Sequence, residues 1–132
     1  MPRVQWPLAV DRPIVEVVLA LQPDGQTLLR RLLADTGAGT ATSAFELILD
    51  EADCLLCGGP SGAAVSLGGA YQLLFPLYDI PLRIPAIGFD QDVLAVGVPS
   101  VPPGSDGIAC FRFLNRFTYG NFGDPSQFGL EN

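Results

Sequence analysis

One carboxylate in this sequence stands out because of its neighbours. Asp35 follows the apolar run Leu32–Ala34 and precedes the small-residue segment "TGAGT". An aspartate in this setting forms a turn, belongs to a phosphate-binding loop, or is one half of a pair of catalytic carboxylates. The phosphate loop is disfavoured because Thr42 stands where the G-x-G-x-x-G pattern needs Gly or Ala for close packing. A turn former and half of a catalytic pair remain.

Other catalytic side chains are scarce. The chain has no His, which removes Ser-His-Asp and Cys-His arrangements and every metal site that contains His. Its three cysteines are Cys54, Cys57 and Cys110, an odd number that does not form a disulfide framework. "CLLC" is a single C-x-x-C that runs into a glycine-rich turn. The pattern favours small buried hydrophobes over redox or metal chemistry, and we expect no metal and no cofactor.

Composition predicts one compact domain over residues 1–132. Hydrophobic residues make up 48% of the chain and charged residues 16%. The net charge is -7, and all seven basic residues are Arg, so there is no basic stripe for nucleic acid. No apolar window is long enough for a membrane span, and "MPRVQWPLAV" lacks the apolar core of a signal peptide. We therefore expect a cytoplasmic protein that binds neither nucleic acid nor membrane.

The elements that must position Asp35 read mostly as strands. Pro13–Leu21 is β-branched and apolar, an Asp-Gly turn follows it, and Thr27–Asp35 completes a predicted hairpin. A helix over "TLLRRLL" is the competing interpretation, and its shortness favours the strand. Ile108–Phe117 alone has helical length. Further strands are expected within 44–56 in its later part, 63–87, 91–101 and 127–131.

A second motif gives Asp35 a context. "SDGIACFRFLNRF" (Ser105–Phe117) is a loop, an apolar pair and a short predicted helix. Together with "LLADTGAGTA" it resembles the retroviral-type, or retropepsin-like, aspartic proteases, which carry apolar-apolar-Asp-Thr/Ser-Gly-Ala and later apolar-apolar-Gly-x-x-apolar-Leu, often introduced by Asp-Gly. The resemblance covers roughly residues 12–130. The residues that match the second motif are Asp106, Gly107, Ile108, Ala109, Phe113 and Leu114.

Three positions depart from the family pattern. Gly39 stands where the family often has Asp, Cys110 where it usually has Gly, and Phe111 where viral members have Arg. The family's Asp and Arg face each other, so their joint loss is consistent with one change, and Arg112 is available for another pairing. Cys110 puts a side chain where close backbone approach is usual.

The resemblance implies an all-β, mainly antiparallel fold with one short C-terminal helix, active as a homodimer. Asp35 would be the catalytic residue. Thr36 would lock the two loops across the two-fold axis, Gly37 would admit the substrate backbone, and Ala38 would pack beside the bound peptide. Because the sequence has a single Asp-Thr-Gly and the chemistry needs two carboxylates, each chain would supply one. The end strand within Ser126–Glu131 would contribute to the dimer interface.

A protease of this type also needs a flap over its substrate. The glycine-rich stretch Leu56–Tyr71 is the candidate. Its tip is placed at Gly58, Gly59 and Gly62 in preference to "LGGAY", and a structural hairpin without a gating role remains an alternative.

The sequence thus predicts an aspartic endopeptidase acting on an extended protein or peptide substrate. The rival hypothesis is a catalytically silent dimeric protein of the same fold that binds peptides or supports assembly. A nucleotide-binding domain is a weaker third.

Overall fold

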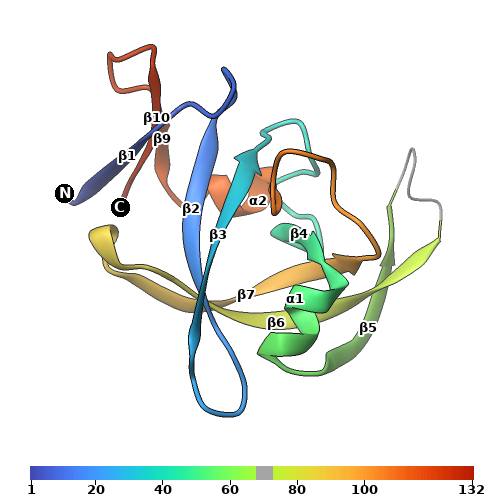
Figure 1. Ribbon diagram of the computed structural model, residues 1–132. Coiled ribbons are helices and arrows are strands. Elements are labelled where there is room, and N and C mark those ends of the chain that lie inside the picture. The colour runs from blue at the N-terminus through green and yellow to red at the C-terminus, as the bar shows by residue number, and fades with distance from the viewer. Residues whose placement is uncertain (68–72) are drawn as a thin grey trace.

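The computed structural model describes residues 1–67 and 73–132. Most elements are strands, and the helices are short (Figure 1). The strands are β1 (Arg3–Pro7), β2 (Ile14–Ala20), β3 (Thr27–Ala34), β4 (Leu47–Asp50), β5 (Pro60–Ser66), β6 (Leu74–Ile84), β7 (Phe89–Val98), β8 (Gly107–Ala109), β9 (Thr118–Gly120) and β10 (Gln127–Glu131). The helices are α1 (Glu51–Cys57), the 3₁₀ turn η1 (Pro85–Ile87) and α2 (Phe111–Leu114).

The predicted hairpin before Asp35 is confirmed. β2 and β3 pair antiparallel from Ile14 opposite Leu33 to Ala20 opposite Thr27. β2 is almost wholly buried, whereas β3 alternates, with Leu32 buried and Arg31 exposed. That period of two belongs to a strand with one face on the core, and it explains why the strand prevails over the competing helix in "TLLRRLL".

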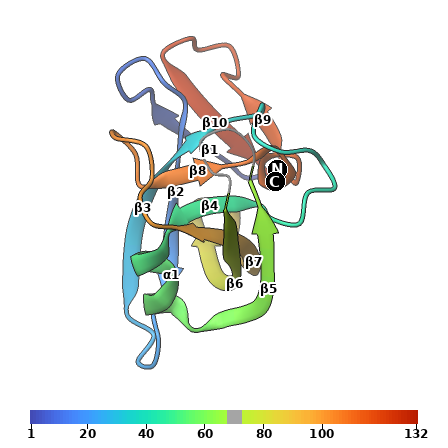
Figure 2. The same cartoon turned by 90° about the vertical axis from the view of Figure 1, so that its right-hand side faces the viewer.

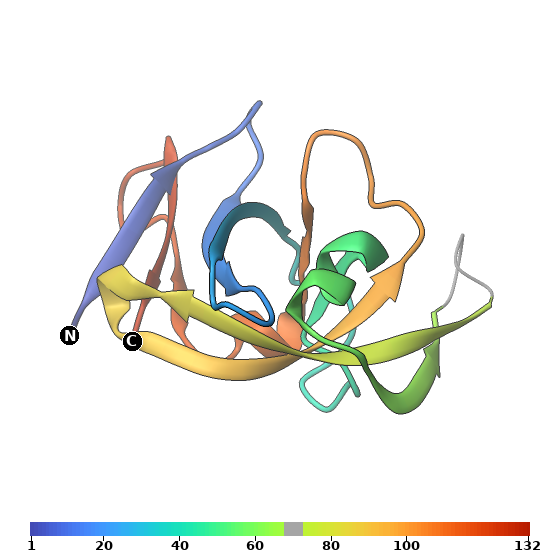
Figure 3. The same cartoon turned by 60° about the horizontal axis from the view of Figure 1, so that its bottom comes forward.

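The larger sheet has the order β2-β3-β8-β4-β7-β6-β5, and a further pairing of β2 with β6 closes the sheet on itself. Most neighbours run antiparallel, as expected, while β3–β8 and β4–β7 are parallel. The long strands β6 and β7 pair antiparallel and run across the width of the molecule (Figure 3). The main hydrophobic cluster draws on the larger sheet, the terminal strands and α2, and it includes Val17, Leu32, Ile80 and Phe113.

Both chain ends join a smaller sheet with the order β1-β10-β9 (Figure 2). β10 pairs with β1 from Gln127 to Glu131 and with β9 through Gly129–Glu131. Arg3 ties this sheet together, because its guanidinium binds Glu131 and lies 4.0 Å from the centre of the Phe122 ring. The predicted C-terminal strand is confirmed. Both edges of β10 are occupied within one chain, and its contribution to a dimer interface stays a prediction.

The helices differ from the prediction in two places. Residues after Asp50 were expected to be extended, but they form α1, which begins where the Asp50 carboxylate accepts the N–H of Ala52 at 3.1 Å. The helix expected over Ile108–Phe117 is only α2, because Ile108 and Ala109 belong to β8. Cys110, between β8 and α2, has extended backbone and is the N-cap residue that precedes the helix. Among the described residues, no helix is long and apolar enough to cross a membrane.

Candidate active site

Asp35 lies directly after the last residue of β3, beside β8. Leu33 pairs with Ile108 and Ala34 with Ala109 in the parallel ladder, and the Asp35 N–H donates to the Ala109 carbonyl at 3.0 Å. The two sequence motifs, about seventy residues apart, are therefore adjacent strands of one sheet. The Asp-Thr-Gly segment leaves the sheet where this ladder ends.

The backbone after Asp35 forms a tight turn. The Gly37 N–H donates to the Asp35 carboxylate oxygen Oδ1 at 2.9 Å, and the Ala38 N–H donates to the Asp35 carbonyl at 3.2 Å. A Cβ at position 37 would lie 3.3 Å from Oδ1, so a small residue suits this position. Asp35 is half-buried, while Thr36 and Gly37 are exposed. The carboxylate is thus held by its own turn at the protein surface, as both the turn and the catalytic interpretation require.

The segment that follows is fastened to α2. The Phe111 N–H donates to the Ala38 carbonyl at 3.0 Å, and Arg112 Nη1 donates to the Ser43 carbonyl at 2.8 Å. Gly39 has φ +74°, and a Cβ there would lie 2.8 Å from Ser43 Oγ. At position 39 a larger residue would disturb this packing. Arg112 does find another pairing, and its partner is a backbone carbonyl of the Asp35 loop.

Asp106 and Gly107 serve the sheet. Asp106 extends the β3–β8 ladder by one step, because its N–H donates to the Arg31 carbonyl and its Oδ2 accepts the Arg31 N–H, both at 2.9 Å. A Cβ on Gly107 would lie 2.5 Å from the Ile48 carbonyl oxygen and 2.9 Å from the Leu49 side chain. Only glycine lets β8 pass between β3 and β4. Ile108 and Ala109 form the rest of β8.

The three cysteines are free and buried. Burial raises the pKa of Cys54 to about 12 and that of Cys57 to about 11. Burial, with a smaller effect of the Asp35 carboxylate, raises the pKa of Cys110 to about 12. Thiols with these pKa values stay protonated near neutral pH and are poor nucleophiles. In the described part of the chain, no group of three or more Cys, Asp or Glu side chains could hold a metal ion.

Sequence reasoning missed one buried ion pair near this loop. Glu46 is only 2% exposed, and both of its carboxylate oxygens accept hydrogen bonds from Arg116. The bond to Glu46 also raises the pKa of Arg116 above its ordinary value. The available signal was a lone Glu inside the apolar run "AFELIL", since a buried carboxylate needs a partner. Nothing local identifies a partner seventy residues away.

The glycines assigned to the flap tip do not lie at a tip. Gly58 and Gly59 connect α1 to β5, and Gly62 lies inside β5. The turn of the β5–β6 hairpin falls beyond Ser66, so the placement of the tip at Gly58–Gly62 is wrong. The other candidate, "LGGAY", falls mostly within 68–72, outside the described residues.

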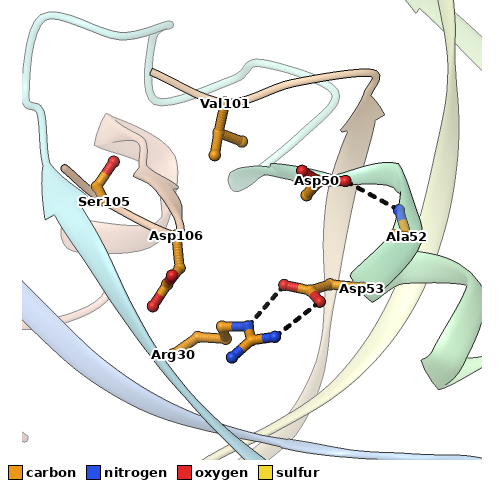
Figure 4. A pocket seen from close by; sticks show the side chains of 7 residues that line it. All are labelled: Arg30, Asp50, Ala52, Asp53, Val101, Ser105 and Asp106. Atoms are coloured by element: carbon orange, nitrogen blue, oxygen red, sulfur yellow. Dashed lines mark hydrogen bonds and ion pairs between the residues drawn. The ribbon is translucent and has the colours of Figure 1, made fainter. Parts of the chain in front are cut away.

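A polar pocket of about 370 Å³ lies beside α1 (Figure 4). Its three carboxylates all have partners: Asp53 accepts two bonds from Arg30 at 2.7 and 3.0 Å, Asp50 caps α1, and Asp106 accepts the Arg31 N–H. A second pocket, of about 220 Å³, is lined by residues 9, 10, 12, 103 and 104. Asp35 lines neither of these two pockets.

Comparison with known proteins gives one structural likeness. No protein-family model and no curated protein matches the chain. The solved structure of a retropepsin-like aspartic protease from Rickettsia conorii is similar over 90% of this chain and 92% of that one, with 13% sequence identity and a TM-score of 0.46. The family in that description is the one that the two sequence motifs resemble. A likeness at this level carries no argument about chemistry, which has to come from the site itself.

Proposed function

We propose that the protein is an aspartic endopeptidase whose active site forms from Asp35 of two identical chains. The observation that carries this proposal is the Asp35 turn: a half-buried carboxylate at the end of β3, bound by the Gly37 N–H and followed by a loop fastened to α2. The sequence contains a single Asp-Thr-Gly, so the second carboxylate is assigned to a second copy.

The chemistry follows from two carboxylates that share one proton. The ionised Asp35 accepts a proton from a water molecule as that water attacks the scissile carbonyl carbon. The protonated Asp35 donates to the carbonyl oxygen, giving a tetrahedral intermediate. Two carboxylates about 3 Å apart do not both ionise near neutral pH, so the pair titrates as a unit. No step needs a metal or a cofactor.

The neighbouring residues take supporting roles in this proposal. Thr36 is exposed, so its hydroxyl is available to bond the partner's loop. Gly37 is exposed as well and lets a substrate backbone approach the carboxylates, while the half-buried Ala38 limits the space beside it. We propose an extended segment of a protein as substrate and the cytoplasm as the place of action.

The dimer in this proposal uses the Asp35 face. A two-fold axis beside Asp35 would bring the two turns together. The terminal sheet can join the interface through the outer edges of β1 or β9 or through its faces, since β10 has no free edge.

Substitution of the carboxylate tests the proposal. Wild type, Asp35→Asn and a matched control, Asp92→Asn on an exposed position of β7, would be incubated with a peptide library and analysed by mass spectrometry. We expect cleavage by the wild type and by the control, and none by Asp35→Asn, because an amide cannot activate water. Thermal unfolding of Asp35→Asn should match that of the wild type.

Assembly is measured on the same samples. Light scattering should give twice the chain mass for the wild type and for Asp35→Asn. Activity from a stable monomer, or full activity of Asp35→Asn, would refute the proposal. A stable dimer that binds peptides without cleaving any would support the silent peptide-binding alternative.

A further inference from the structure

Glu46 forms hydrogen bonds with residues on both sides of α2. Its backbone carbonyl accepts the N–H of Cys110, the residue before α2, at 3.0 Å. Its carboxylate accepts two hydrogen bonds from Arg116, which lies two residues beyond the last residue of α2. Its own N–H donates to the Leu94 carbonyl of β7 at 2.8 Å. One residue therefore connects β7, the start of α2 and the end of α2.

Arg116 is fixed from a second direction as well. Its Nη1 donates to Gln91 Oε1 at 3.1 Å, and its guanidinium lies 5.7 Å from the centre of the Phe89 ring. Both of these residues belong to β7. The planar guanidinium therefore has a defined orientation, which a lysine ammonium could not reproduce.

The Asp35 loop is bonded to α2, the helix that Glu46 flanks with its hydrogen bonds. The Phe111 N–H, in the first residue of α2, donates to the Ala38 carbonyl, and Arg112 donates to the Ser43 carbonyl. A rotation of α2 would move both of these donors. The loop is thus bonded to α2, and Glu46 is bonded to the residues on both sides of α2.

From these contacts we infer that the Glu46–Arg116 pair is a positioning device, which orients α2 and through it the loop that carries Asp35. The inference rests on the proposed function for its catalytic consequence, but not for its structural one. Neither residue touches a substrate, so both are positioning residues. The other bidentate pair, Arg30–Asp53, joins β3 to α1, and none of its bonds reaches α2.

The test must separate positioning from stability. Removal of one partner leaves a buried charge and destabilises any protein, whereas replacement of both partners by apolar residues is often neutral for stability. The test protein is therefore the double variant Glu46→Met, Arg116→Met. Arg116→Lys keeps the charge without the paired geometry and provides a graded step. The double variant Arg30→Met, Asp53→Met is the matched control.

Two readouts are needed. Amide hydrogen exchange at Phe111, compared with exchange in the β6–β7 ladder, reports the bond to the Asp35 loop without any assay of activity. Steady-state kinetics gives kcat and KM. For the Glu46→Met, Arg116→Met protein we expect Phe111 exchange to rise at least tenfold while the β6–β7 ladder is unchanged. We also expect kcat to fall at least tenfold while KM stays within twofold.

Arg116→Lys should fall between this variant and the wild type, and the Arg30→Met, Asp53→Met control should change neither readout. Phe111 exchange equal to that of the wild type would overturn the inference, whatever happens to kcat. So would an equal change in the control. If the wild type cleaves no peptide, the proposed function fails, and exchange at Phe111 alone decides the inference.

Discussion

The Asp35 loop and the β5–β6 hairpin are held in very different ways. The loop is bonded to β8 through the Asp35 N–H and to α2 at two points, where Phe111 and Arg112 donate to its carbonyls. β5 is the last strand of its sheet and, among the described residues, pairs only with β6. All of its residues except Val65 are exposed. Its register also shifts between Pro60 and Ala64.

The contrast fits a division of labour in the proposed protease. A reacting group must be held in one geometry, so it belongs on anchored backbone. A segment that admits and covers a long substrate has to open, so it comes from the least stable part of a fold. Exposed strand edges and few buried apolar contacts are the physical basis of that lower stability. The predictions below test each side of the comparison.

The largest expected effect comes from Gly107→Ala, which disturbs the packing of β8 beside the Asp35 loop. The new methyl group would meet the Ile48 carbonyl oxygen at 2.5 Å, forcing β8 away from β4. We expect the free energy of unfolding to fall by about 3 kcal/mol, as for other overpacked sites. Urea denaturation measures this.

Gly59→Ala is the matched control for that substitution. No atom of residues 1–67 or 73–132 lies within 4 Å of a Cβ at position 59, and its φ lies outside the positive range. The control should change stability by less than about 0.5 kcal/mol. If both substitutions lowered the free energy of unfolding equally, the packing around β8 would be no tighter than the packing around the α1–β5 connection.

Alkaline pH gives the next prediction, in which each titrating thiol has a smaller effect than the Gly107 substitution. The folded-state pKa values of the thiols, about 11 to 12, lie above the unfolded value of 9.0. Between these values the folded chain binds more protons than the unfolded chain, so stability is fully present below pH 9 and declines as pH rises toward 11. Each thiol contributes at most about 1.4 kcal/mol of loss per pH unit. Urea denaturation at pH 8, 9 and 10 measures the slope.

The cysteines also distinguish the two regions. Cys110 begins α2 beside the Asp35 loop, while Cys57 ends α1 just before β5. A thiol reagent at pH 8 should therefore modify Cys57 faster than Cys110, because the segment beside Cys57 opens at lower free energy. Faster modification of Cys110 would reverse the comparison. Replacement of all three cysteines by Ala should flatten the alkaline decline.

The sequence predicted the β2–β3 hairpin and the position of Asp35, because interactions between residues close together in the chain determine both. The β2–β3 hairpin combines β-branched residues, alternation and an Asp-Gly turn, so its strands and the place of Asp35 at the end of β3 could be read directly. β8 could not, because three residues such as Gly107–Ala109 form a strand only when β3 and β4 are present on either side. The Glu46–Arg116 pair could not be predicted either, because its two residues are far apart in the chain and meet only in the fold.

Competition between short signals explains the other misses. Asp50 is an N-cap, and Glu51 and Asp53 occupy the first turn of α1, a readable helix start. Because the apolar residues of β4 come directly before this helix start, the predicted strand was continued into the residues of α1. The flap was misplaced because "CGGPSG" looks like a turn, yet α1 ends there and an exposed strand begins.

The smallest expected effect comes from Gly62→Ala in β5. Position 62 has φ +95°, where side chains other than glycine are strained, yet no atom in the described part of the chain lies within 4 Å of a Cβ there. The strain amounts to about 1 kcal/mol. An edge strand can relieve it by opening locally, so we expect amide exchange in β5 to accelerate several-fold while the urea midpoint moves little. Gly59→Ala, with equal space and no positive φ, should leave exchange in β5 unchanged. If Gly62→Ala lowers the global stability by the full strain and the β5 amides exchange no faster than those of the β6–β7 ladder, then β5 unfolds only with the core. The hairpin would then be as firmly held as the Asp35 loop, and it could not be the opening half of the proposed site.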